Sequence, residues 1–120
     1  MRGDCYADVC PARRILTHVT GRWGSLVLAA LVEGTLRYSA LRARIGGISE
    51  KMLAQTLREL EADGLVTRTS RPVVPPHVDY ALTAHGRGIA AHLHALIDYI
   101  ETNVVELAPA FAALSATRSS

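Results

Sequence analysis

The dipeptide Gly46-Gly47 constrains the fold more than any other feature, because it joins two helical patterns with almost no connecting chain. Segment 38–45 has apolar residues four positions apart and basic residues on its other faces, which predicts a helix before the glycines. Ser49 is a good N-cap for a second helix that ends at Gly64. Two helices joined by so short a turn predict a helix-turn-helix pair.

Further helices are predicted on both sides of this pair. Pro11 suits the first position of a short helix that ends at Gly21, and the apolar segment 23–32 is typical of a buried central helix. Near the other end, a long helix that begins close to Thr83 and is broken by Pro109 carries an apolar stripe. The stripe recurs at steps of three or four residues and consists of Ile89, Leu93, Leu96, Ile100, Val104 and Leu107.

Two β-type segments follow the helix pair, at 65–71 and 78–82. Both contain β-branched or aromatic residues, which favour strands. Three prolines lie between them, and because proline cannot donate a ladder hydrogen bond they mark a projecting loop. With a minimal strand at 35–37, this order predicts a mainly α fold with a small β-hairpin wing (α+β), which is a winged helix-turn-helix.

The length of 120 residues and the hydrophobic content of 49% suit one core. We expect a single domain over 1–120, with 1–9 as a flexible lead and 109–120 as a short C-terminal helix and tail. The longest apolar run, 26–32, is far shorter than the roughly 20 residues of a membrane span, and the N-terminus lacks an apolar signal core. A cytoplasmic location without membrane contact is therefore expected.

Charge is unevenly distributed along the chain. Residues 35–88 contain eight bases and five acids, a balance of +3, whereas the chain after Gly88 has three acids and one base. The surplus of positive charge in the middle of the chain favours contact with a polyanion there.

The predicted helix 49–63 has two different faces. At 100° per residue, Leu53, Leu57 and Leu60 lie within about 60° of one another and form an apolar side. The nearly opposite stripe is polar and consists of Lys51, Gln55 and Arg58. Arginine and lysine contact guanine or phosphate and glutamine pairs with adenine, so these residue types suit DNA readout in the major groove. The alternative is an ordinary solvated stripe.

Segment 46–66 resembles the helix-turn-helix of the HxlR-type family of bacterial regulators, with GGISEKML followed by LRELEADGLV. The resemblance extends over 10–86, in order and in spacing. The other matching motifs are Cys10-Pro11, Gly21-Arg22-Trp23, Leu36-Arg37-Tyr38-Ser39, Leu41-Arg42, Val74-Pro75-Pro76, Tyr80-Ala81-Leu82-Thr83 and Gly86.

The resemblance implies a homodimeric DNA-binding repressor or activator whose first and last helices build the dimer. We therefore expect a sequence-specific transcriptional regulator on a near-palindromic operator, with half-sites about one helical turn, 10 to 10.5 bp, apart. The expected contacts to double-stranded DNA are Ser39, Arg42, Ser49, Lys51, Gln55, Arg58, Arg71 and His77.

The apolar stripe of the last helix is longer than a domain of this size can cover. An isologous contact with a second copy is expected to cover it, and packing on the first two helices is the alternative. The expected dimer interface consists of Ile15, Ile89, Leu93, Leu96, Ile100 and Val104.

Cys10 precedes Pro11 at the start of the first predicted helix, where backbone N–H groups and the helix dipole favour a thiolate. Some members of the resembled family use a cysteine at the matching position as a sensor. The hypothesis is that Cys10 senses an oxidant or electrophile and that Cys5 resolves its oxidised form. In the alternative, both remain reduced thiols without a sensing role.

No catalytic, cofactor or metal site is expected, so the chain is predicted not to be an enzyme. The sequence has no Gly-rich phosphate loop after a strand, no HExxH and no recognisable Ser/His/Asp set.

Two other functions stay open. One is control by a small-molecule effector bound between the long helix and the DNA-binding body, with Trp23, Tyr99 or Phe111 as lining candidates. The other is a winged helix that binds proteins without DNA readout.

Overall fold

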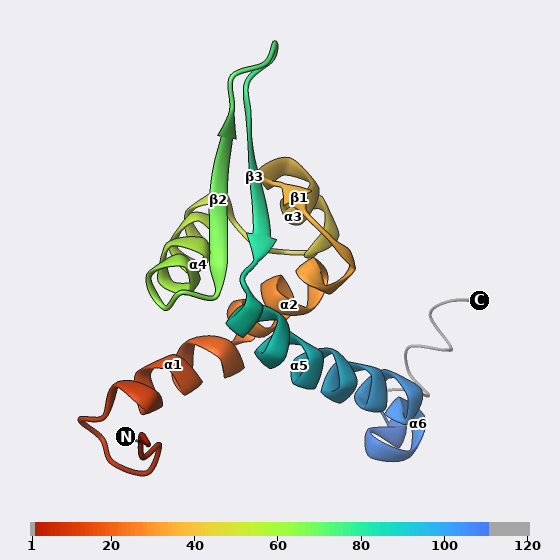
Figure 1. The fold of residues 1–120 in the computed structure, drawn as a ribbon. Helices are drawn as coiled ribbons and strands as arrows, with labels where there is room; N and C mark the ends of the chain where they lie inside the picture. Colours follow the sequence, from red (N-terminus) through yellow and green to blue (C-terminus); the bar gives the residue numbers. More distant parts are fainter. Residues whose placement is uncertain (1, 111–120) are drawn as a thin grey trace.

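A computed structural model describes residues 2–110 of the protein (Figure 1). Its elements follow the predicted order, and the fold is mainly helical with one small antiparallel sheet, which confirms the predicted fold class. The elements are α1 (Pro11–Thr20), α2 (Arg22–Ala30), the 3-10 helix η1 (Leu31–Glu33), β1 (Leu36–Arg37), α3 (Tyr38–Arg44), α4 (Glu50–Ala62), β2 (Val66–Arg71), β3 (His77–Leu82), α5 (Ala84–Thr102) and α6 (Val104–Leu107).

The three strands form one antiparallel sheet in the order β1-β3-β2. β2 and β3 make the predicted hairpin, whose ladder extends to the pair Arg71 and His77 near the tip. β1 directly precedes α3, and its Leu36 pairs with Tyr80 of β3. The sheet therefore fixes the start of the helix pair relative to the hairpin wing.

One hydrophobic core joins the helices to the sheet, and α2 lies at its centre in contact with α1, α4 and α5. Leu53, Leu57 and Leu60 of α4 are at most 1% exposed, which confirms the predicted apolar face of that helix. Leu28 of α2 and Leu41 of α3 are fully buried in the same cluster. The inner face of α4 is thus held by the core, and its outer face is left to solvent.

Two glycines allow helices to approach other backbone closely. A Cβ atom on Gly24 of α2 would lie 2.0 Å from the carbonyl oxygen of His18 in α1. A Cβ atom on Gly86, in the first turn of α5, would lie 2.0 Å from the carbonyl oxygen of Leu65. A side chain cannot be accommodated so close to a backbone oxygen, so only glycine fits at these positions. The two contacts set where α1 and α5 leave the core.

The prediction of one continuous helix over 83–107 is wrong at its end. α5 ends before Asn103, whose φ of −111° and ψ of 16° are not helical, and α6 follows. The Asn103 side-chain amide donates to the carbonyl oxygen of Tyr99 at 2.8 Å, the same acceptor that its backbone N–H uses. Asparagine side chains compete for backbone groups in this way and favour helix ends. Most of the predicted C-terminal helix and tail, 109–120, lies outside the described residues.

Helices α1 and α5 extend from the core in different directions, on the side away from the hairpin tip (Figure 1). The radius of gyration, 16.5 Å, exceeds the value of about 14 Å that is typical of a compact chain of this length. We call α5 and α6 together the C-terminal arm. Its far end projects from the body and so has little of the protein's own core to pack against.

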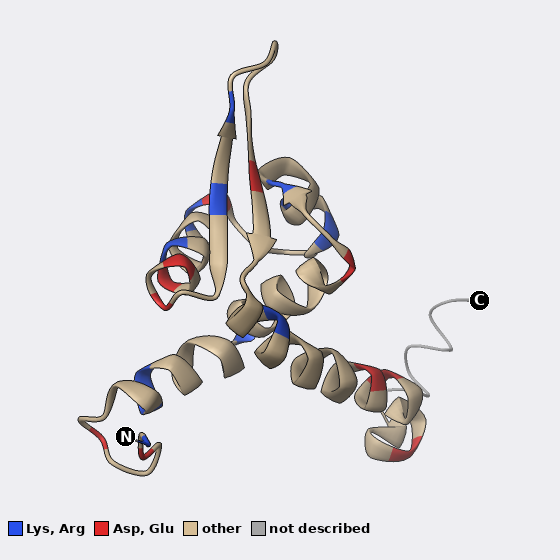
Figure 2. Cartoon of the chain, viewed as in Figure 1, with Lys and Arg blue, Asp and Glu red and all other residues tan. Residues whose placement is uncertain are grey.

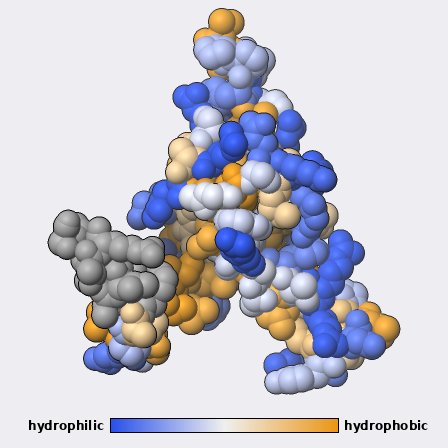
Figure 3. Space-filling view, turned by 180° about the vertical axis from the view of Figure 1, so that it is seen from behind, coloured by the Kyte–Doolittle hydropathy of each residue, from blue (hydrophilic) through white to orange (hydrophobic). Residues whose placement is uncertain are grey.

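The apolar stripe of the C-terminal arm is divided between the core and solvent. Leu93 is 7% exposed within the protein's own core, and its expected part in a dimer interface stays a prediction. Ile89, and Ile15 of α1, are partly buried against the same core. The apolar surface farther along the arm, visible in Figure 3, includes Leu96, Tyr99, Ile100, Val104, Val105 and Leu107.

No single helix within residues 2–110 is long and apolar enough to cross a membrane. The segments Pro11–Thr20 and Arg22–Glu33 reach that length only together, and they are bent by 74° at their junction. Val27 and Leu28 of this pair are fully buried in the core.

Candidate nucleic-acid interface

Helix α4 presents a polar outer face. The Ser49 hydroxyl caps the helix by accepting from the Met52 N–H at 3.1 Å, in agreement with its predicted N-cap position. Because the leucine face is buried, Lys51, Gln55 and Arg58 are exposed on the outside. In the described part of the chain, no ion pair includes Lys51 or Arg58. Both cations are therefore available to an external anion.

Lys and Arg positions lie on α3, α4 and the hairpin; α4 and β3 also carry acidic positions, and the far end of the C-terminal arm is acidic (Figure 2). Ser39 and Arg42, two of the predicted DNA contacts, are exposed on α3. Arg42 Nη1 lies 3.3 Å from Oε1 of Glu50, at the start of α4. The Tyr38 hydroxyl donates to the backbone carbonyl of Glu50 at 2.9 Å. These contacts tie the two helices together across the glycine turn.

The predicted wing contacts, Arg71 and His77, share one carboxylate. Arg71 Nε donates to Asp79 Oδ2 at 2.9 Å, and His77 Nε2 lies 3.5 Å from Asp79 Oδ1. The Arg71 side chain is nevertheless 55% exposed. Arg68, a base that the sequence patterns did not single out, is also exposed on β2, because both faces of that strand are open beyond Val66. Its position in the basic middle segment was the one sequence signal for it.

A second group of contacts joins α1 to α4. His18 Nδ1 lies 2.5 Å from Asp63 Oδ2, and His18 Nε2 lies 3.4 Å from Glu59 Oε2. Glu59 Oε1 in turn accepts from Gln55 Nε2 at 3.0 Å. No local pattern predicts this network, because His18 and Asp63 are 45 residues apart. Its effect is that the Gln55 amide, on the outer face, is engaged by an acid of the same helix.

Cys10 occupies the N-cap position of α1 and is half-buried. Its sulfur accepts from the Asp4 N–H at 3.3 Å. The backbone N–H of Asp4, followed by those of Ala12 and Arg13, lowers the pKa of the Cys10 thiol, against an opposing effect of burial. Cys5 is exposed, and neither cysteine is in a disulfide. The predicted bias of Cys10 toward thiolate therefore has a local structural cause.

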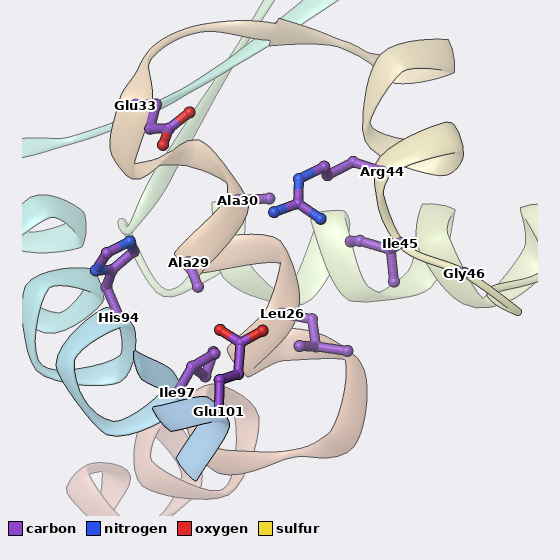
Figure 4. Close-up of a pocket in the computed structure, with 10 residues that line it drawn as sticks. All are labelled: Leu26, Ala29, Ala30, Glu33, Arg44, Ile45, Gly46, His94, Ile97 and Glu101. Carbon is purple, nitrogen blue, oxygen red and sulfur yellow. The ribbon is translucent and has the colours of Figure 1, made fainter. Parts of the chain in front are cut away.

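A cavity of about 320 Å³ lies between α2, the end of α3 and the C-terminal arm (Figure 4). Its walls include the apolar side chains of Leu26, Ala29 and Ile97. Arg44 and Glu101 point into it from different elements. The predicted lining residues Trp23 and Tyr99 are not part of the wall, and Phe111 lies outside the described residues. Trp23 instead packs against the core, with the Arg22 guanidinium 4.5 Å from its ring centre.

The family of HxlR-like helix-turn-helix proteins matches residues 18–107. The chain belongs to this family. It is 54% identical to the HTH-type transcriptional regulator YtfH of Escherichia coli (strain K12) over 105 aligned residues. The aligned region covers 88% of this chain and 83% of YtfH. The structure of ytfH from Salmonella typhimurium, described as a candidate transcriptional regulator, has 48% identity and a TM-score of 0.80 over 99% of this chain and 100% of that one. This HxlR-family chain is accordingly a helix-turn-helix transcriptional regulator.

A redox regulator is among the structures similar to this HxlR-family protein. The oxidised form of HypR has 34% identity and a TM-score of 0.70, over 78% of this chain and 97% of HypR. The relatives reported above are named as regulators and not as enzymes. Within residues 2–110, no group of three or more His, Cys, Asp or Glu side chains is placed to hold a metal ion.

Proposed function

We propose that the protein binds duplex DNA sequence-specifically as a homodimer, with α4 as the recognition helix in the major groove. The division of α4 into a fully buried leucine face and an exposed polar face carries this proposal. The core holds the helix rigidly, while Lys51, Gln55 and Arg58 offer groups that suit phosphates and base edges. Helix-turn-helix proteins place the second helix of the pair in the groove in this way.

Contacts to the DNA backbone are assigned to α3 and the wing. Ser39 and Arg42 are exposed beside α4, and Arg71 and His77 lie near the tip of the hairpin. To contact a phosphate, the Arg71 guanidinium has to bind the phosphate together with Asp79 or release Asp79. Ser49 contributes mainly by ordering the N-terminus of the recognition helix, since its hydroxyl already accepts from that helix. Backbone N–H groups at a helix N-terminus favour an anion.

A second copy of the chain is proposed to cover the exposed side of the C-terminal arm. Leu96 and Ile100 are 56% and 47% exposed, more apolar surface than isolated side chains on a monomer require. A twofold contact between two arms would bury both stripes and set the distance between two recognition helices. We therefore expect a near-palindromic operator with half-sites about 10 to 10.5 bp apart.

Selection of bound sequences from random duplex DNA tests this proposal. The expected operator is near-palindromic, is bound by two chains, and loses affinity steeply as salt increases. Gln55→Ala or Arg58→Ala should cost about 1 to 3 kcal/mol and change the preference at one base position. Asp98→Ala, on the far arm, is a control that should leave the preference unchanged. Binding of a monomer to a single asymmetric site would contradict the dimer, and normal readout by both folded α4 variants would contradict the role of α4.

We further propose that Cys10 senses an oxidant or electrophile. The lowered pKa of its thiol supports this role, as does the similarity to a protein named as a redox regulator. Oxidation at the start of α1 would displace that helix, which packs on α4, and so alter operator affinity. The measurement is operator affinity with and without diamide for wild type, Cys10→Ser and Cys5→Ser. An equal response of wild type and Cys10→Ser would remove Cys10 from this role.

Control by a small-molecule effector is a second candidate, favoured by the cavity between α2, α3 and the C-terminal arm. Its apolar wall, which also carries one arginine, one histidine and two glutamates, suits a small amphipathic molecule that carries charge. A panel of such molecules should raise the unfolding temperature of wild type but not of Ala29→Phe, which fills the cavity. If no molecule of the panel raises the unfolding temperature of wild type above that of Ala29→Phe, this candidate would be contradicted.

A further inference from the structure

We infer that Glu59 and His18 are positioning residues of α4, which hold the Gln55 amide in one orientation and so determine which base it selects. The inference rests on the proposed function, because it requires α4 to read DNA. Glu59 and His18 lie behind the polar stripe and belong to none of the contacts proposed above. Their part is to restrict a side chain that would otherwise turn freely in solvent.

The contacts form a continuous line from the outer face of α4 to α1. Gln55 Nε2 donates to Glu59 Oε1 at 3.0 Å, one helical turn away. The other carboxylate oxygen of Glu59 lies 3.4 Å from His18 Nε2, and the opposite ring nitrogen lies 2.5 Å from Asp63 Oδ2. The Glu59 carboxylate is therefore held between an amide and an imidazole, with one oxygen directed to each.

The inner end of this line is fixed. The side chain of Asp63 is 4% exposed and that of His18 17%, whereas that of Glu59 is 37% exposed. Asp63 is the C-cap of α4, and its N–H donates to the Glu59 carbonyl oxygen at 3.0 Å. The His18 carbonyl lies against Gly24 of α2, where a Cβ atom would be 2.0 Å away. The imidazole is thus held by Asp63 while the backbone that carries it packs against α2, and Glu59 is oriented from this fixed position.

A carboxylate can only accept hydrogen bonds, so it distinguishes the two ends of the Gln55 amide. The amide nitrogen turns toward Glu59, and Gln55 Oε1 turns away with one N–H left to donate. An acceptor beside a donor matches the amino group and N7 of adenine in the major groove. Without Glu59 the amide can rotate by half a turn and present the reverse order, which adenine does not match.

Competition binding to four operators that differ only at the base read by Gln55 tests the inference, with the full-length protein and the operator found by selection. Glu59→Ala should reduce the preference for adenine about fivefold or more, a large part of what one bidentate contact supplies. Glu59→Gln, whose amide can present either an oxygen or an N–H to Gln55, should restore only part of it. Glu61→Ala is the matched control, because it removes the same charge from an exposed position of α4 outside this network.

His18→Asn, whose side chain is too short to reach Glu59, should give a smaller loss of adenine preference. Because this variant also removes a contact between α1 and α4, its unfolding temperature is measured in parallel. Glu59 is more exposed than His18 and lies outside the core. Its variants therefore test the positioning of Gln55 even if His18→Asn unfolds.

The double variant Gln55→Ala/Glu59→Ala separates the positioning role of Glu59 from the base contact of Gln55. It should discriminate no worse than Gln55→Ala, because Glu59 acts only through the amide. Equal changes on all four operators for Glu59→Ala and Glu61→Ala, with base-specific loss in Gln55→Ala, would overturn the inference and leave the proposed function standing. A Gln55→Ala variant with unchanged base preference would overturn both the proposed contact and its positioning.

Discussion

Helix α4 and the C-terminal arm are both amphipathic, but only α4 has its apolar side covered along its whole length. The leucines of α4 are at most 1% exposed, whereas Leu96 and Ile100 of the arm are about half exposed. The cause is position, because α4 lies against the sheet and α2 while the arm extends beyond the core (Figure 1). An apolar stripe therefore indicates that a helix needs a partner, and the tertiary structure decides whether that partner lies in the same chain.

The largest expected effect is the difference in unfolding free energy between an alanine variant of a core leucine and one of an arm leucine. Leu57→Ala should lower the free energy of unfolding by about 2 to 5 kcal/mol, because it leaves a cavity in a packed core. Leu96→Ala, at concentrations where the chain is monomeric, should change it by less than about 0.5 kcal/mol. Urea unfolding followed by circular dichroism measures both. Equal costs in the monomer would show that the arm is packed like α4 and would break the comparison.

The junction between body and arm is tested by two glycines of α5. Gly86→Ala should destabilise by about 1 to 3 kcal/mol, because its Cβ would meet the Leu65 carbonyl oxygen. Gly88→Ala, where no atom lies within 4 Å of the new Cβ, should stabilise by about 0.5 to 1 kcal/mol through helix propensity. Thermal unfolding of the pair gives the sign of each change. Stabilisation by both would show that the arm does not leave the body at Gly86 as described.

Ile100→Glu sharpens the role assigned to the arm. A charge on the exposed stripe should raise the dimer dissociation constant about tenfold or more, since the interface would have to bury it. Ala91→Glu adds the same charge to the opposite face of α5, where it should have little effect. Sedimentation velocity over a range of concentrations provides the constants. A dimer insensitive to Ile100→Glu would place the interface elsewhere.

The smallest expected effect concerns Cys10, whose pKa is lowered by backbone groups of its own chain. Alkylation of Cys10 should begin at lower pH in the native protein than in the urea-unfolded chain, because the thiolate fraction sets the rate. This lowering adds stability above the unfolded pKa, and that stability is lost as pH falls through the native value. The same profile should persist in Ile100→Glu, since the cause does not involve the arm. If the alkylation profile of Ile100→Glu matched that of the unfolded chain, the lowered pKa of Cys10 would depend on the arm.

Most elements could be predicted because their signals are local. Ser49 caps α4 as its position indicated, and the angular pattern of Leu53, Leu57 and Leu60 located the buried face. The end of the long helix was missed because Asn103 interrupts a stripe whose apolar period continues past it. The burial of Leu93 in the protein's own core could not be predicted for a related reason, since periodicity does not show where the core ends along a helix.

The amino-acid sequence by itself determined the order of elements, the helix caps, the two faces of α4 and the family resemblance, because these depend on residues within a few positions of one another. Only the tertiary structure decided that Arg71 meets Asp79 across the hairpin and that His18 meets Asp63 and Glu59 across two helices. Such contacts depend on how helices cross and strands pair. At the crossing of α1 and α2 the geometry rests on the absence of a side chain at Gly24, which becomes meaningful only beside the backbone it touches.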